Sequence, residues 1–185
     1  MPSDSSDASC NLTDQMNDFF GPDGKLSLAN AYEYRKEQQE MACIIAKSLE
    51  TSQDLIIEAG TGVGKTLAYL APGVLHALDK NKKLVVSTKT INLQEQIIDK
   101  DLPFLQGLLE FGFTSVLLKG RTNYLCPRRL KLALNNSRDL FEVDEFDQLE
   151  SIEDWAINTQ DGTLSDLDFT PSAKLWSQVC SESRL

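Results

Sequence analysis

A glycine-rich segment ending in Gly-Lys-Thr is the part of this sequence best suited to chemistry. Glycines permit backbone conformations in which successive N–H groups point at one anion, and a following helix adds its positive N-terminal end. In such a cradle, Lys65 would reach the β- and γ-phosphates of a nucleoside triphosphate, and the Thr66 hydroxyl would help to hold Mg²⁺. The predicted binding segment consists of Glu58, Ala59, Gly60, Thr61, Gly62, Val63, Gly64, Lys65 and Thr66.

The generic form of this motif has glycine where this chain has Ala59. The alternative interpretation is an ordinary glycine-rich turn before a helix. The apolar run at residues 55–58 and the helical pattern after Lys65 favour the phosphate cradle, because such a loop must connect a strand to a helix.

The elements around the loop predict an α/β domain. Short apolar runs with β-branched members predict strands at residues 55–58, 84–87 and 115–118. Helices are predicted at 35–49, at 65–78 with a bend or break at Pro72-Gly73, and from 91 to about 102. This order predicts a doubly wound parallel sheet with helices on both faces, the P-loop NTPase (RecA-like) fold.

Other polar residues indicate which nucleotide and which further ligand the chain could bind. Gln38, preceded by Arg35, lies upstream of the loop, and a glutamine amide can pair with the N6 and N7 edge of adenine. Thr88, Lys89 and Gln96 follow the second predicted strand and are suited to holding a nucleic-acid backbone. The simpler alternatives are an exposed helical glutamine and a helix N-cap at residue 90 or 92.

Length, composition and charge limit the possible classes of protein. The chain has 185 residues, 41% of them hydrophobic, a net charge of −10, and no segment that approaches a membrane span. Its polar start predicts a disordered tail over residues 1–18 and, lacking a signal peptide, a cytoplasmic protein. The cysteines Cys10, Cys43, Cys126 and Cys180 are widely spaced, which favours buried thiols or one ligand of a larger site over disulfides.

The sequence changes character after Cys126. A basic cluster (Lys119, Arg121, Arg128, Arg129 and Lys131) precedes eleven acidic residues between 139 and 168 without a basic one. A positive face could hold DNA despite the negative net charge, but taken alone each run is better explained as a solvated helix face. A helix is predicted over 128–149, broken near 135–136, with a turn at 161–163. We expect an incomplete motor domain over 19–122 and a partial, mainly helical insert over 123–185.

Several segments resemble the DinG-type helicases, relatives of the XPD helicases in superfamily 2. The resemblance rests on residues 19–24, 32–42, 58–66, 86–97 and 119–127, which occur in the same order. It implies an ATP- and Mg²⁺-dependent 5′-to-3′ DNA helicase of DNA repair that carries a [4Fe–4S] cluster. It also implies that Gln38 reads adenine, that Arg121 contacts single-stranded DNA and that Cys126 ligates iron.

The departures from that family define the expected role of this chain. A cluster needs four thiolates, and the resemblance leaves open whether Cys180 is the second ligand or whether that ligand follows Leu185. We find no Asp-Glu-Ala-His-like box to hold Mg²⁺ and position water, and no second motor domain. We therefore expect the N-terminal fragment of a helicase, inactive alone. A stand-alone nucleotide-binding regulatory module is the alternative, and a small-molecule kinase is disfavoured.

Overall fold

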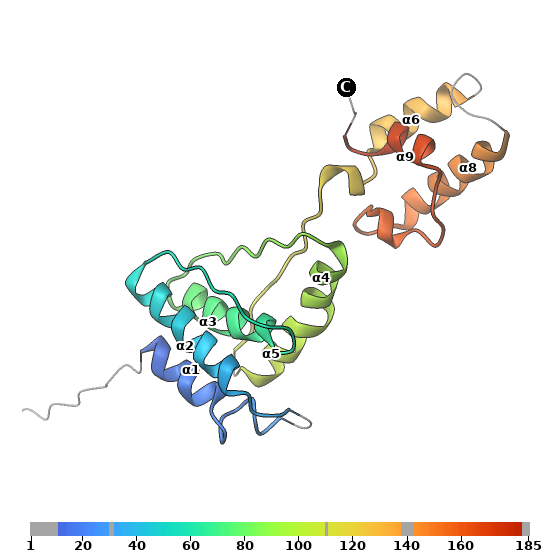
Figure 1. Cartoon of the computed structure of the whole chain (residues 1–185). Coiled ribbons are helices and arrows are strands. Elements are labelled where there is room, and N and C mark those ends of the chain that lie inside the picture. The colour runs from blue at the N-terminus through green and yellow to red at the C-terminus, as the bar shows by residue number, and fades with distance from the viewer. Residues whose placement is uncertain (1–10, 30–31, 110, 138–142, 183–185) are drawn as a thin grey trace, which may run out of the picture. The chain divides into compact units, whose positions relative to one another are not determined.

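The computed structural model describes residues 11–29, 32–109, 111–137 and 143–182, with side chains at 143 and 144 left out (Figure 1). Two compact units make up the chain: unit 1, Met1–Leu117, and unit 2, Leu118–Leu185. Each unit has its own hydrophobic core. The division therefore falls a few residues before the boundary at 122/123 that the sequence suggested.

Unit 1 is built from helices. They are α1 (Leu12–Phe20), α2 (Lys36–Thr51), α3 (Lys65–Asp79), α4 (Ile91–Gln96) and α5 (Leu102–Leu108), with a π-helical turn at Ile97–Asp101 between the last two. In α2 and α3, small residues such as Ala42, Ala46, Ala68 and Ala71 are buried, so the helices can approach closely. Helix α2 packs against both α1 and α3 (Figure 1).

Helix α1 corrects the predicted disordered tail. Residues 12–18 are helical, and the Asn11 side chain caps the helix by accepting a hydrogen bond from the Asp14 N–H at 2.7 Å. Met16, Phe19 and Phe20 are buried in the core of unit 1. Their spacing places them on one face of the helix, a pattern that the surrounding polar residues conceal. Residues 1–10 of the expected tail lie outside the described residues.

The predicted strands are not confirmed in the described residues. Residues 55–58, 84–87 and 115–118 run as connections without helical or strand pairing (Figure 1). Their apolar side chains are exposed: Ile56 by 99%, Val85 by 85% and Val116 by 80%. An apolar run indicates where a strand can form, but only a neighbouring strand supplies the ladder that creates it.

The predicted break at Pro72 and the predicted helix end near Leu102 are also wrong. Helix α3 continues through Pro72, which is buried with its neighbours, so packing outweighs the lost backbone hydrogen bond. The helix that starts at Ile91 does not stop at Leu102 but continues through the π-helical turn to Leu108, with Leu102 and Leu105 buried. The predicted helix at 35–49 is confirmed as α2.

Unit 2 is a small helical layer held by a few cross-connections. It contains 3₁₀ turns at Arg121–Asn123 and Leu164–Asp166 and the helices α6 (Pro127–Asn135), α8 (Val143–Asn158) and α9 (Ala173–Val179). The predicted break near 135–136 and the turn at 161–163 are confirmed, the turn with Gly162 at a φ of 66°. In the described part of the chain, no helix is both long and apolar enough to cross a bilayer.

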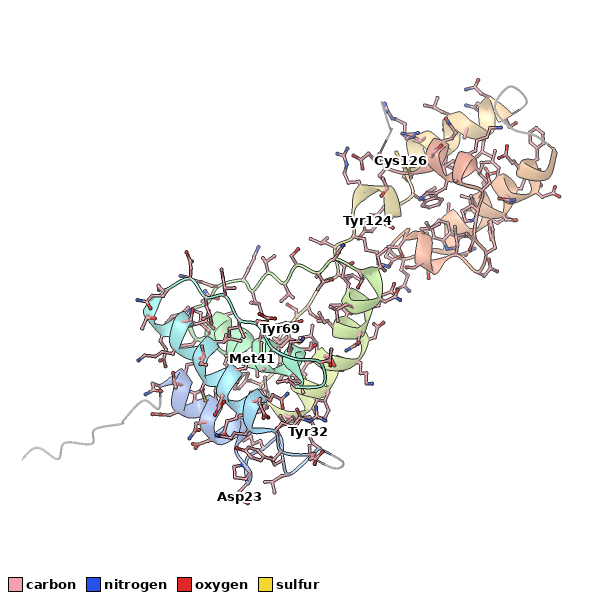
Figure 2. The ribbon with its side chains drawn as sticks, viewed as in Figure 1. Asp23, Tyr32, Met41, Tyr69, Tyr124 and Cys126 are labelled. Atoms are coloured by element: carbon pink, nitrogen blue, oxygen red, sulfur yellow. The ribbon has the colours of Figure 1, made fainter. Side chains whose placement is uncertain are left out.

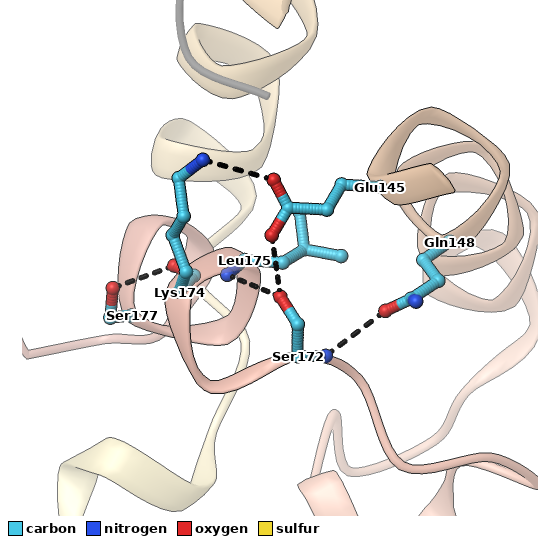
Figure 3. Close-up of polar contacts among 6 residues, drawn as sticks. All are labelled: Glu145, Gln148, Ser172, Lys174, Leu175 and Ser177. Carbon is cyan, nitrogen blue, oxygen red and sulfur yellow. Dashed lines mark hydrogen bonds and ion pairs between the residues drawn. The ribbon is translucent and has the colours of Figure 1, made fainter. Parts of the chain in front are cut away.

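Ser172 joins α9 to α8 (Figure 3). Its hydroxyl accepts a hydrogen bond from the Leu175 N–H at 3.1 Å, as an N-cap, and donates to a Glu145 carboxylate oxygen at 2.8 Å. Its backbone N–H donates to Gln148 Oε1 at 3.0 Å, and Lys174 forms an ion pair with the second Glu145 oxygen. One serine thus satisfies the start of α9 and attaches it to α8.

Replacing this serine tests the attachment. We expect Ser172→Ala to lower the free energy of unfolding of unit 2 by about 1–2 kcal/mol, because the cap and the bond to Glu145 are both lost. Tryptophan fluorescence during urea unfolding reports on unit 2 alone, since both tryptophans, Trp155 and Trp176, belong to it. Ser177→Ala, in the same helix, is the control and should change stability by less than about 0.5 kcal/mol. Equal effects of both changes would contradict the attachment.

Candidate nucleotide-binding site

The glycine-rich loop leads directly into α3, as a phosphate cradle requires. Gly62 and Gly64 both have a φ of 83°, in the left-handed region that favours glycine, and Gly64 is the N-cap residue of α3. A Cβ at Gly64 would lie 2.4 Å from Gln38 Nε2, whereas a Cβ at Gly60 would meet nothing within 4 Å. The end of the loop is therefore closely packed, and its middle is open.

Lys65 and Thr66 lie at the start of α3. The exposed Lys65 ammonium donates to the carbonyl oxygens of Ala59 at 2.9 Å and Gly60 at 3.2 Å, so it reaches back across the loop. Thr66 forms a side-chain hydrogen bond with Tyr69, one turn later. Burial raises the pKa of Tyr69, Asp101 raises it further, and the bond to Thr66 opposes the rise.

Two residues that precede the loop in sequence hold its backbone. The Arg35 guanidinium donates to the Gly62 carbonyl at 2.8 Å, and Gln38 Nε2 donates to the Gly64 carbonyl at 2.8 Å. The structure thus brings Arg35 and Gln38 to the loop, more than twenty residues away, whereas the sequence suggested for Gln38 only a role at the base. Each bond fixes a carbonyl and, with it, the direction of the next N–H group.

Gln38 is not the exposed helical glutamine of the simpler interpretation. Its side chain is buried, with 1% of the residue exposed, and its Oε1 accepts a hydrogen bond from the Tyr32 hydroxyl. The role of Tyr32 was not visible in the sequence, because it lies six positions before Gln38, in the irregular segment that precedes α2. Tyr69 was missed too, although its position three residues after Thr66 on a helix is a usable signal.

The predicted nucleic-acid contacts are divided between the two units. In unit 1, Thr88 donates to the Thr90 carbonyl at 3.1 Å, and Gln96 Nε2 donates to Asp101 at 3.1 Å, beside the π-helical turn. Thr90 is the N-cap residue of α4, as the simpler interpretation allowed. Lys89 is exposed on the same connection, and Arg121 begins the first 3₁₀ turn of unit 2.

The basic cluster of unit 2 is used partly for folding. The Arg129 guanidinium donates to the carbonyl oxygens of Ser177 at 2.5 Å and Gln178 at 2.9 Å. Lys119 Nζ donates to Ser165 at 2.6 Å. These two cations therefore hold α9 and the second 3₁₀ turn in place. Part of the basic cluster thus serves folding and is not reserved for DNA.

The backbone segments that carry Cys126 and Cys180 pair in unit 2. An isolated antiparallel bridge joins Leu125 to Cys180, and the Cys126 N–H donates to the Val179 carbonyl at 2.8 Å. Cys180 is buried in the core, with its thiol 3.1 Å from the Glu182 carbonyl, whereas Cys126 is half-buried. Among the described residues, no three potential metal-ligating side chains cluster. Two thiols do not fit the four that a [4Fe–4S] cluster needs.

A glycine loop closed by Gly-Lys-Thr at a helix N-terminus defines a P-loop NTPase. The comparisons with known proteins specify the class further. The pattern of the DEAD/DEAH box helicases matches residues 35–131, so the chain belongs to that family and to its P-loop NTPase fold, which uses ATP and Mg²⁺.

Similar proteins include two ATP-dependent helicases and one exonuclease. The chain is 38% identical over 168 residues to the ATP-dependent DNA helicase YoaA of Escherichia coli, covering 90% of this chain and 26% of YoaA. It is 37% identical over 166 residues to the ATP-dependent helicase DinG of Mycobacterium tuberculosis, covering 81% and 25%. The 3′-5′ exonuclease DinG of Bacillus subtilis is 33% identical over 156 residues, covering 82% and 16%. The chain thus spans about a quarter or less of these relatives.

The close packing at Gly64 can be measured. We expect Gly64→Ala to destabilise unit 1 by about 1–3 kcal/mol, because alanine is strained at this φ and its Cβ would overlap the Gln38 amide. Far-ultraviolet circular dichroism during urea unfolding measures the loss, and tryptophan fluorescence checks that unit 2 is unchanged. Gly60→Ala, in open space, is the matched control. A Gly64→Ala chain as stable as the control would show that the loop is not held this way.

The two thiols of unit 2 should differ in reactivity. Cys126 is half-buried and Cys180 is buried, so iodoacetamide should alkylate Cys126 at least about tenfold faster in the folded chain. Cys43 provides an internal comparison: burial, with a contribution from Asp14, raises the pKa of its thiol, which leaves less thiolate at pH 8. Mass spectrometry of the alkylated peptides gives the three rates. Equal rates for Cys126 and Cys180 would contradict the assignment of Cys180 to the core.

Proposed function

We propose that this chain is the nucleotide-binding part of the motor of an ATP-dependent DNA helicase. The observation that carries the proposal is the braced phosphate loop. Arg35 and Gln38 hold the carbonyl oxygens of Gly62 and Gly64, and Lys65 lies across the loop. The family assignment and the similarity to YoaA and DinG support this function.

In the proposed mechanism, each loop residue has a defined task. Lys65 exchanges its bonds to the Ala59 and Gly60 carbonyls for bonds to the β- and γ-phosphates. The first N–H groups of α3 and the helix dipole attract the same charge. Thr66, whose hydroxyl bonds Tyr69, would hold Mg²⁺, and the ion would supply positive charge against the phosphates. The remaining members, from Glu58 to Val63, shape the backbone that surrounds the phosphates.

The adenine base is assigned to Gln38. Its amide uses one lone pair of Oε1 for Tyr32 and one N–H for Gly64, so one acceptor and one donor position remain for the N6 and N7 edge of adenine. Because the side chain is buried, reading the base requires a local opening between the segment before α2 and the loop. The loop and the base site are then coupled through one side chain.

We also propose that the connections at 55–58, 84–87 and 115–118 become strands of a parallel sheet in the complete motor. Their exposed apolar side chains support this, because a sheet covered on both faces by helices buries such residues. The chain covers only about a quarter of YoaA, so most of that motor lies in sequence outside this chain.

Single-stranded DNA is the proposed partner. We assign its backbone contacts to Thr88, Lys89 and Gln96, which follow the second of these connections and begin α4, and to Arg121 in unit 2. Hydroxyl, amide and cationic groups of this kind bind phosphates without reading sequence. Translocation from 5′ to 3′, a role in DNA repair and a cytoplasmic location rest on the similarity to DinG-type helicases.

Unit 2 is the proposed iron–sulfur-type insert, with Cys126 as its first ligand. The half-buried thiol of Cys126 is available for a metal, whereas Cys180 is packed in the core. The described residues alone do not supply the ligand set, and no step of the proposed mechanism depends on the cluster.

A stand-alone nucleotide-binding module is the second candidate. It is favoured by the separate hydrophobic core of unit 1, which includes residues from α1, α2, α3 and α5. Such a module would bind ATP and report its presence without hydrolysis. Cooperative unfolding of unit 1 that ATP shifts, in a protein without a longer form, would support this candidate.

Nucleotide binding by the 185-residue chain tests both candidates. Mg-ATP should raise the melting temperature of unit 1, and Lys65→Ala should weaken binding at least about tenfold, since a bond to a charged phosphate contributes about 1.5–3 kcal/mol. Calorimetric titration gives both affinities, with the exposed Lys47→Ala as the control.

Hydrolysis should be missing from this chain. We expect no DNA-stimulated release of phosphate, because we find no sequence box that supplies the carboxylate and the water-positioning residue. Turnover clearly above that of Lys65→Ala, with single-stranded DNA present, would overturn this expectation and assign hydrolysis to the chain itself.

A further inference from the structure

Tyr32 lies between α5 and the phosphate loop. Its ring stacks on that of Phe104 in α5, with centroids 6.4 Å apart and an interplanar angle of 21°. Its hydroxyl donates to Gln38 Oε1 at the start of α2, near the labelled Tyr32 in Figure 2. One aromatic residue thus contacts the helix that follows the proposed DNA-binding residues and the glutamine that holds the loop.

The Gly64 carbonyl decides how the Gln38 amide is oriented. A carbonyl oxygen can only accept, so the end of the amide that faces it must be the NH₂ group, at 2.8 Å. The opposite end, Oε1, then needs a donor, and the Tyr32 hydroxyl is that donor. A buried amide oxygen without a donor costs free energy, so loss of the hydroxyl would favour rotation or withdrawal of the amide.

The hydroxyl remains a donor over a broad pH range. Burial raises the pKa of Tyr32, and the bond to Gln38 and the charge of Arg35 offset only part of that rise. The loop is also sensitive to the position of the amide, because the site of a Cβ on Gly64 lies 2.9 Å from Gln38 Cδ. A small movement of Gln38 therefore changes the environment of Gly64 directly.

We propose that Tyr32 is a positioning residue for the phosphate loop: its hydroxyl fixes the Gln38 amide, which holds the Gly64 carbonyl at the start of α3. Its contribution to nucleotide binding rests on the proposed function, but its effect on the loop does not. Because it acts on the backbone that surrounds the phosphates, its effect extends to phosphate ligands that carry no base. The stack on Phe104 extends the contact to α5.

The first experiment needs no nucleotide. The Ala68 N–H donates to the same Gly64 carbonyl at 3.3 Å, so its hydrogen exchange, measured by NMR in the 185-residue chain, reports on that carbonyl. Tyr32→Phe keeps the ring and removes the hydroxyl, and it should speed exchange of the Ala68 amide by about three- to tenfold. An unchanged rate would overturn the proposal.

Tyr34→Phe is the matched control. The Tyr34 hydroxyl also donates to a glutamine, Gln39 Oε1 at 2.9 Å, but that glutamine bonds Asn17 rather than the loop. We expect no change in Ala68 exchange. If Tyr32→Phe lowers overall stability, Gln38→Met provides a second test: adding Tyr32→Phe to it should have no further effect on Ala68. A further increase in the double variant would show that Tyr32 does not act through Gln38.

Ligand binding distinguishes a role at the phosphates from a role at the base. Tyr32→Phe should weaken binding of inorganic tripolyphosphate about three- to tenfold and binding of Mg-ATP by at least that factor, because the Gln38 amide is also assigned to the base. A loss confined to ATP would place Tyr32 at the adenine and overturn the proposal. If the unchanged chain binds neither ligand while Ala68 exchange responds to Tyr32→Phe, the proposed function fails and the positioning role stands.

Discussion

The hydrogen bond from Gln38 to the Gly64 carbonyl is the constraint on which the site depends. It joins the first turn of α2 to the last residue before α3, across more than twenty residues of sequence. Because α2 is packed between α1 and α3, the glutamine is held by the core of unit 1. The loop glycines can adopt many conformations, and this bond with its neighbour from Arg35 selects one of them.

The same arrangement links parts of the site with different tasks. Gln38 contacts the loop and Tyr32, Tyr32 stacks on Phe104, and Tyr69 connects Thr66 to the electrostatic field of Asp101 in the π-helical turn. Gln96 also bonds Asp101, so a residue assigned to DNA and a residue beside the nucleotide site face one carboxylate.

In unit 2, a few polar contacts hold an acidic segment and its helices together. Arg129 and Lys119 hold backbone and hydroxyl oxygens, and Ser172 attaches α9 to α8 through Glu145 and Gln148. These contacts organise the chain around Cys126 and withdraw Cys180 into the core. The net acidic charge between 139 and 168 therefore coexists with local cationic contacts that serve folding rather than nucleic acid.

The local chemistry could be predicted from the sequence, because the loop motif, helix α2 and the turn at 161–163 depend on neighbouring residues. Helix α1, the continuation of α3 through Pro72 and the course of the helix beyond Leu102 could not, since burial against other helices outweighed local propensity there. The strands at 55–58, 84–87 and 115–118 remain predictions, because strand pairing needs partners that periodicity does not reveal. The sequence alone determined the order and spacing of the residues that we propose to bind phosphate. Only the tertiary structure decided that Gln38 is buried against Gly64, because that contact depends on how α2 packs against α3.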